Sequence, residues 1–260
     1  VAPAFVGQFG PKVTPDMIKT ALKELGFYDV YETAIGADMG AMAEAENYVK
    51  EVATGELPFL LTSCCPSWSM LAKKFFQETI DKISNELTPM VATARKIKED
   101  YPDASVVFIG PCASKKLEAS RRTVRSDVDF VITFEELAGM FEAKGLLPEA
   151  VEAHDHMNDA TSAGRGYGVA GGVASAIESC IREYYPDVEV HIEHAESLAE
   201  CKKMLMLAKA GKKNGCLIEG MACPGGCVAG AGTNIPIPQA VKEVTSFKNA
   251  AEEKLPSRED

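Results

Sequence analysis

The chain has little positive charge and no long apolar run. Its 260 residues hold 27 lysines and arginines against 38 aspartates and glutamates, which gives a net charge of −11. This excess of acidic groups argues against binding to nucleic acid or to anionic membrane surfaces. No apolar run is long enough to span a bilayer, and no signal peptide is recognisable. The sequence therefore predicts neither a nucleic-acid partner nor a membrane span.

Histidine is also scarce, and its four copies are poor candidates for metal ligands. Only His154 and His156 have a ligand-like spacing, and both lie in a polar stretch that we expect to face solvent. The chain begins at Val1, inside an apolar segment, as we expect of a domain excised from a longer protein. Missing targeting signals therefore say little about the full-length protein.

Cysteine, by contrast, is plentiful: the chain has eight. Five of them follow apolar, strand-like runs in motifs that contain glycine or proline, and these are Cys64, Cys65, Cys112, Cys223 and Cys227. Such clustering favours a metal over disulfides, and soft thiolates select iron–sulfur clusters, zinc or copper(I). We interpret the set as an iron–sulfur site, with zinc and structural thiols as alternatives. An iron–sulfur site would imply a reducing, cytoplasmic setting.

The neighbours of these cysteines refine the interpretation. Adjacent side chains on an extended backbone point to opposite sides, so one thiol of the Cys64–Cys65 pair can bind a metal while the other faces another space. Lys115 lies three residues after Cys112, where its ammonium would bind an anionic ligand. We expect Glu118 to be a simple surface carboxylate. The remaining cysteines are expected to be small buried apolar residues, and they are Cys180, Cys201 and Cys216.

Strand-like and helix-like segments alternate along the chain, which predicts an α/β protein with parallel sheets covered by helices. The expected strands are 1–6, 28–32, 58–61, 105–110, 128–133, 188–193 and 216–219. The expected helices are 15–25, 38–53, 90–98, 134–143, 173–184, 197–210 and 239–253, with one more after each of Cys65 and Cys112. Because ligands bind beyond the carboxyl ends of parallel strands, all three cysteine motifs are well placed. The glycine-rich stretch 166–172 follows no strand, so close packing or approach to a cofactor is favoured there over a nucleotide site.

At these residues the sequence resembles the catalytic domain of the FeFe-hydrogenases, the iron-only hydrogenases. The three signature stretches of that family occur in order, at 62–68, 110–118 and 219–232. The resemblance covers nearly the whole chain. It implies a single H-cluster domain over residues 1–260, made of two lobes of mainly parallel β-sheet flanked by helices, with the cluster site between the lobes.

The resemblance also implies a cofactor. A 4Fe-4S cubane would be held by Cys65, Cys112, Cys223 and Cys227. Cys227 would also bridge to a two-iron subsite that carries carbon monoxide, cyanide and an azadithiolate, which completes the H-cluster. This subsite is built by maturation proteins, so an unmatured sample would lack it. Lys115 would hydrogen-bond one cyanide, Met221 would pack against the two-iron site, and Pro3 would lie near the other cyanide.

The activity implied by the resemblance is the reversible conversion of hydrogen to two protons and two electrons. Cys64 would be the proton relay, a task that suits a thiol because its pKa is close enough to neutral. Counted from Cys64 without gaps, Glu44 and Ser84 match a glutamate and a serine of the family's proton route. Asn47 stands where many members have a second glutamate, and Glu51 stands where they have arginine. Since an amide cannot titrate, the usual outer half of the route is interrupted.

Two other functions remain open. Ala4, Met90 and Gly110 differ from common family residues, as in divergent branches thought to sense hydrogen with slow turnover. The other alternative is a hydrogenase-like iron–sulfur assembly protein, although those proteins lack the paired cysteines present here. For an enzyme, the partners would be hydrogen, protons and a redox protein such as ferredoxin or further iron–sulfur domains.

Overall fold

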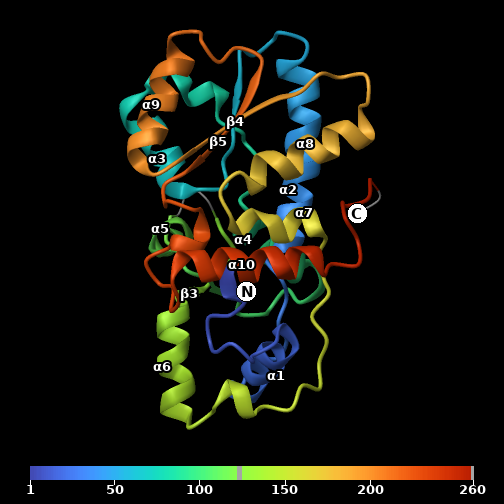
Figure 1. The fold of residues 1–260 in the computed structure, drawn as a ribbon, viewed down its shortest axis with the longest axis vertical. Helices are drawn as coiled ribbons and strands as arrows, with labels where there is room; N and C mark the ends of the chain where they lie inside the picture. The colour runs from blue at the N-terminus through green and yellow to red at the C-terminus, as the bar shows by residue number, and fades with distance from the viewer. Residues whose placement is uncertain (122–124, 259–260) are drawn as a thin grey trace.

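The computed structural model describes residues 1–121 and 125–258, and it contains two parallel sheets. The first sheet has the strand order β1-β5-β4, with β1 (Leu60–Leu61), β5 (Cys216–Met221) and β4 (His191–Glu196). The second sheet pairs β2 (Val107–Ile109) with β3 (Phe130–Ile132). In Figure 1 the first sheet lies in the upper half of the molecule and β3 in the lower half. The predicted α/β class with parallel sheets is therefore confirmed.

Helices surround both sheets. They are α1 (Pro15–Leu25), α2 (Ala34–Asn47), α3 (Pro66–Phe75), α4 (Pro89–Asp100), α5 (Ala113–Ala119), α6 (Phe134–Lys144), α7 (Ser162–Arg165), α8 (Gly172–Tyr184), α9 (Leu198–Lys209) and α10 (Ile237–Asn249). A π-helical turn, Tyr48–Val52, continues α2, so the helix predicted at 38–53 starts four residues earlier than expected. Figure 1 shows α10 crossing the middle of the molecule, between the upper elements and α1 and α6 below.

Local sequence signals explain where several helices begin and end. Thr14 accepts a hydrogen bond from the backbone of Met17 at the start of α1, and Gly26 ends that helix in the left-handed conformation. Thr133 and Glu136 form a capping box at the start of α6. These caps fix the helix ends independently of tertiary contacts, which is why the sequence predicted them well.

The three-stranded sheet is covered on both faces. Leu60 and Leu217 pack in one apolar cluster with α2 and α8, whereas Leu61 and Ile218 pack in another with α3 and α9. This alternation follows from the two-residue period of a strand. Both faces of β5 are consequently buried, as expected for a parallel strand in the middle of a sheet.

A third apolar cluster fills the lower lobe. It joins β2 and β3 to α1, α4, α6 and α10, and it includes Phe5, Phe134 and Phe141. Phe5 contacts Phe247 of α10 edge to face, with the ring centroids 5.6 Å apart. The lower lobe thus has its own core, separate from the two faces of the upper sheet.

Two predicted strands are wrong. Residues 1–6 form a short 3-10 turn at Pro3–Phe5, and 28–32 have no strand structure. The N–H of Ala2 donates to the carbonyl of Ile109. Val1 bonds to the backbone of Tyr31 and Thr33. An apolar run becomes a strand only when it pairs along a ladder, and these few bonds do not make one.

Candidate metal centre

All three cysteine motifs lie just beyond the carboxyl ends of strands. Cys64 and Cys65 follow β1, Cys112 follows β2, and Cys223 and Cys227 follow β5. These five thiols are half-buried, and each of the eight cysteines is a free thiol. The site therefore draws on both sheets, which is where ligands bind in parallel α/β folds.

The charges of four of these thiols affect one another's pKa values, which indicates that the four lie close together. Burial, followed by the charges of Cys112 and Cys65, raises the pKa of the Cys223 thiol. Burial also raises the pKa of Cys227, and the charges of Cys112, Cys65 and Cys223 raise it further. Like charges have this effect only at short range, so Cys112 from one sheet and Cys223 from the other are neighbours.

The first turns of two helices meet at this space. Cys65 is the N-cap residue of α3 and Cys112 that of α5. The hydroxyl groups of Ser67 and Ser114 lie 2.6 Å apart and join the two helices. Burial raises the pKa of Cys65, whereas hydrogen bonds from the backbone N–H groups of Ala222 and Trp68 lower it. These N–H groups stabilise negative charge on the sulfur.

Glycines let the loop after β5 approach other segments closely. A Cβ on Gly226 would lie 2.5 Å from the backbone nitrogen of Ala170, and one on Gly230 would lie 2.5 Å from the carbonyl oxygen of Pro111. The N–H of Ala170 also donates to the carbonyl of Gly225 at 3.0 Å. The stretch 166–172 is thus in close packing contact with the cysteine loop, as its glycines predicted.

The thiols are not grouped as ligands of a single metal ion among the described residues. Within 1–121 and 125–258, no three histidine, cysteine, aspartate or glutamate side chains could hold one metal ion. A structural zinc site needs its ligands to converge on one ion, with zinc–sulfur distances of about 2.3 Å. A cubane binds each thiolate at a different iron corner, so its ligands lie further apart. A cubane takes four thiolates, which is the number that the motif cysteines other than Cys64 provide. His154 and His156 are exposed, as predicted.

Lys115 and Glu118 form a buried ion pair next to the paired cysteines. The ammonium of Lys115 donates to the Glu118 carboxylate at 2.7 Å and to the backbone carbonyl of Cys64 at 3.3 Å. The expectation that Glu118 is a surface carboxylate is wrong, because the residue is only 6% exposed. The i,i+3 spacing places the two charges on one helix face, and that face turns inward.

Glu44 and Ser84, counted from Cys64 in the sequence, lie together in the fold. Hydrogen bonding with the Ser84 hydroxyl and the Ser63 backbone acts to lower the pKa of the Glu44 carboxyl. Glu44 is 3% exposed. Burial raises the pKa of this carboxyl to about 7, with smaller contributions from the charges of Glu86 and Glu219. A buried carboxyl near neutral pKa is suited to accept and donate protons.

Cys64 faces the same region. Burial, followed by the charges of Glu44 and Glu219, raises the pKa of its thiol well above the ordinary value, so the near-neutral thiol pKa expected from the sequence is wrong for the cofactor-free protein. The structure thus brings Cys64, Glu44 and Ser84 together, with Cys64 on the side of Cys65 and Cys227, whose charges also act on it.

Two residues beside Cys64 were missed by sequence reasoning. The carboxylate of Glu219 accepts from the N–H groups of Gly171 and Ala174, both at 2.8 Å, at the start of α8. The Tyr167 hydroxyl is buried and has no hydrogen-bond partner among the described residues. Burial, then the charges of Glu44 and Cys64, raises the pKa of Tyr167 well above its usual value. The sequence did offer one signal for Glu219, because this residue begins the third motif.

Met221 and Pro3 also lie at the edges of this region. Met221 ends β5, is 3% exposed, and accepts a contact from the Cys201 thiol at 3.4 Å through its carbonyl. A Cβ on Gly168 would lie 3.7 Å from the Cβ of Pro3, so Pro3 packs on the stretch that contacts the cysteine loop. The three cysteines outside the motifs are buried as predicted, and they are Cys180, Cys201 and Cys216.

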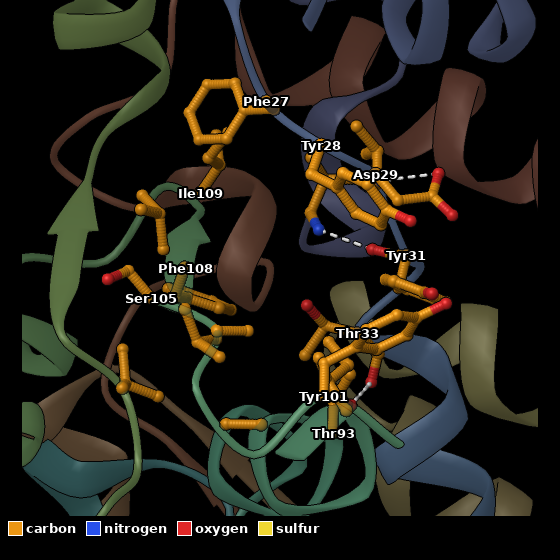
Figure 2. A pocket seen from close by; sticks show the side chains of 18 of the residues that line it. Phe27, Tyr28, Asp29, Tyr31, Thr33, Thr93, Tyr101, Ser105, Phe108 and Ile109 are labelled. Atoms are coloured by element: carbon orange, nitrogen blue, oxygen red, sulfur yellow. Dashed lines mark hydrogen bonds between the residues drawn. The ribbon is translucent and has the colours of Figure 1, made fainter. Parts of the chain in front are cut away.

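Two cavities differ in how close their lining residues come to this site. One, of about 560 Å³, is lined by residues of 27–33 and 100–109 (Figure 2), and it contains none of the predicted site residues. Figure 2 shows Tyr28 and Tyr31 on one wall and Phe108 on the other. A smaller cavity, of about 310 Å³, is lined by Pro66, Ser67 and Ser114, directly after two motif cysteines. The thiol site is therefore distinct from the larger cavity.

No helix among the described residues combines the length and apolar character needed to cross a membrane.

Iron hydrogenase 1 of Clostridium pasteurianum is 31% identical over 280 residues, which cover 91% of this chain and 48% of the relative. A cytosolic iron-sulfur assembly component 3 of Pongo abelii is 26% identical over 277 residues, or 86% of this chain and 58% of that protein. The chain spans about half the length of such curated relatives.

Solved structures share the fold. A variant of the FeFe-hydrogenase HydA1 from Chlamydomonas reinhardtii superposes with a TM-score of 0.79 at 22% identity, and the match covers 97% of this chain and 85% of that one. The family described as "Iron only hydrogenase large subunit, C-terminal domain" matches residues 1–231. With its cysteine motifs gathered at the strand ends, this chain belongs to that family, the C-terminal domain of the iron-only hydrogenase large subunit.

Proposed function

We propose that this domain binds an H-cluster and interconverts hydrogen with two protons and two electrons. The observation that carries the proposal is the set of four half-buried thiols that follow strands of two different sheets, with a fifth thiol whose charge interacts with that of the buried Glu44 carboxyl. The cubane ligands would be Cys65, Cys112, Cys223 and Cys227, with Cys227 bridging to the two-iron subsite. When bound, the cluster would supply an electron-poor metal with an open position and a path for electrons.

The protein's own groups would move the protons. Cys64 would hold a proton next to the cluster and pass it to Glu44, whose pKa of about 7 lets it exchange protons at neutral pH. The Ser84 hydroxyl, bonded to Glu44, would carry the proton outward. Lys115 would place its positive charge near an anionic ligand of the cluster, since its ammonium already reaches the backbone of Cys64.

Two further residues would pack against the two-iron subsite and its ligands. Met221 would pack against the two-iron subsite, and Pro3 would lie near one of its cyanide ligands. Met221 ends β5 directly before the loop that carries Cys223 and Cys227, and Pro3 packs on Gly168, in the stretch that contacts this loop. In the cytoplasm, the partners would be maturation proteins, hydrogen, and a ferredoxin or an attached iron–sulfur domain as the redox partner.

Infrared spectroscopy of the matured protein under anaerobic conditions tests this proposal. We expect carbon monoxide and cyanide stretches together with hydrogen evolution. In Cys64→Ala, the stretches should remain while hydrogen evolution falls by roughly 100-fold or more, the range expected when a general acid is removed. Cys180→Ala, at a buried cysteine far from the motifs in sequence, serves as the control and should keep both. Unchanged turnover in Cys64→Ala would remove Cys64 from the mechanism.

A role in iron–sulfur assembly is the second candidate, and the similarity to the cytosolic assembly component favours it. In that case the protein would bind iron–sulfur clusters but would acquire no two-iron subsite. A matured sample with visible iron–sulfur absorption, no carbon monoxide stretches and no turnover would support assembly over catalysis.

A further inference from the structure

We infer that Glu86, held by Asn47, is the carboxylate that exchanges protons between solvent and the buried Glu44–Ser84 pair. The inference rests on the proposed function, because it extends the same proton route to the surface. Asn47 itself has no titratable group. The carboxylate at the outer end of the proton route would instead be that of Glu86, which lies in the turn before α4.

Three hydrogen bonds fix Glu86 at this place. Its carboxylate accepts from the side-chain amide of Asn47 at 2.8 Å. Its backbone N–H donates to the Ser84 hydroxyl at 3.2 Å, and its carbonyl accepts from the Ser63 hydroxyl at 3.0 Å. Glu86 is therefore tied both to α2, which carries Glu44, and to the turn before Cys64.

Exposure rises along this group of residues. Glu44 is 3% exposed and Ser84 is 7% exposed, whereas Glu86 is half-buried and reaches solvent. The charge of Glu86 also acts on Glu44 and raises its pKa, after the larger effect of burial. The hydrogen bond from the Glu86 backbone to the Ser84 hydroxyl places the two residues next to each other, and a water molecule between the Glu86 carboxylate and that hydroxyl would complete the route.

The proton balance of the step is simple. A protonated Glu86 gives its proton to the bridging water, the water gives one of its own protons to the Ser84 hydroxyl, and that hydroxyl gives its proton to the carboxylate of Glu44. A serine hydroxyl can do this because it has one donor and two acceptor positions. Glu86 is left charged and takes its next proton from solvent. The same steps run backwards during hydrogen oxidation.

Other titratable groups around Glu44 are less suited to this task. Glu219 is fully buried and bonded to two backbone N–H groups of the α8 start. Tyr167 is buried, and Cys64 lies on the side of the cluster cysteines. Among the described groups whose charges interact with that of Glu44, Glu86 is the carboxylate that is partly exposed to solvent.

A titration of the cofactor-free protein provides the first test. Carbon-13 NMR of labelled glutamate carboxyls should give a Glu44 pKa near 7 in the wild type and a lower value in Glu86→Gln, because a like charge has been removed. Glu46→Gln is the matched control, since Glu46 is an exposed carboxylate on α2, the helix that carries Glu44, and it is paired with Lys50. Equal Glu44 titrations in both variants would overturn the inference.

Hydrogen–deuterium exchange catalysed by the matured protein provides the second test. Glu86→Gln should slow exchange by roughly tenfold or more and change its pH profile, as expected when one acid–base group is lost. Adding Asn47→Glu to that variant should restore the rate, because it returns a carboxylate to the same place. Glu86→Gln behaving like Glu46→Gln would contradict the inference alone. A cluster-loaded wild type without any exchange would overturn the proposed function itself.

Discussion

At the scale of single residues, the main feature is a carboxyl group buried where it cannot easily stay charged. Hydrogen bonding with Ser84 and Ser63 acts to lower the pKa of Glu44, yet burial outweighs it and the pKa lies near 7. An ordinary glutamate, with a pKa of 4.5, would be fully charged at neutral pH. The group is therefore poised to change protonation in the range where the protein is expected to work.

This pKa has a consequence for stability. Between pH 4.5 and about 7 the folded protein binds more protons at Glu44 than the unfolded chain does. The stabilisation from this group is therefore complete below pH 4.5 and is lost as the pH rises through about 7, for a total of roughly 3 kcal/mol. In Glu44→Gln, which does not titrate, this loss should disappear.

Urea unfolding of the cofactor-free protein at pH 5 and pH 8 measures the effect. Wild type should lose more unfolding free energy between the two pH values than Glu44→Gln does, by an amount on the order of 3 kcal/mol. Identical pH dependence in the two proteins would mean that Glu44 has an ordinary pKa.

The cysteine residues were predictable because their motifs are local, whereas several partners were not. Lys115 and Glu118 are three residues apart, yet the sequence does not reveal that their helix face turns inward. Asn47 and Glu86 are separated by 39 positions, and only the folded chain brings them within hydrogen-bond distance. Burial and long-range pairing are tertiary properties, so no local pattern contains them.

At the scale of elements, the start of α8 depends on a side chain from the central strand. Gly171 precedes the helix in the left-handed conformation and offers no capping side chain. Glu219 of β5 supplies the missing acceptor for two N–H groups. A negative group at a helix N-terminus also interacts favourably with the helix dipole.

Glu219→Ala should therefore destabilise the protein by about 1–3 kcal/mol, because buried N–H groups lose their partner. Glu219→Gln keeps an acceptor oxygen and should lose less. Glu178→Ala, which removes an i,i+4 pair with Arg182 on the same helix, should lose no more than about 0.5 kcal/mol. Chemical denaturation of the three variants measures these differences. A Glu219→Ala loss as small as that of Glu178→Ala would show that the cap does not stabilise α8.

The elements themselves were predicted unevenly. Helices with caps, such as α1 and α6, were found with nearly correct ends because their signals lie within a few residues. The runs 1–6 and 28–32 have strand-like composition but no ladder of hydrogen bonds. β4 begins three residues later than expected, since pairing with β5 rather than local alternation decides its register.

At the scale of the whole molecule, the thiol site lies where the two sheets meet. Cys112 follows β2 of one sheet, while the other motif cysteines follow β1 and β5 of the other. A cluster bound to all of them would connect the two sheets through its iron–sulfur bonds. Because it would bind the folded state and not the unfolded chain, it should stabilise the protein.

Removal of the cluster should therefore lower the midpoint of thermal unfolding. Cys112→Ser should prevent stable cubane binding and give a protein whose midpoint matches that of the cluster-free wild type. Cys180→Ala, outside the site, should keep the visible iron–sulfur absorption. Calorimetry and absorption of reconstituted samples measure both quantities. A Cys112→Ser protein with full cluster content would remove Cys112 from the ligand set.

The position of β5 bears on how such a protein is made. It is the last strand in the chain, yet it lies between β1 and β4. A nascent chain that has not yet reached residue 216 contains the two outer strands but not the strand that joins them. It also lacks the last two motif cysteines, Cys223 and Cys227. Such distant pairing is slow to form. A cluster held by all four of these cysteines could consequently form only after synthesis has passed Cys227, the last of them.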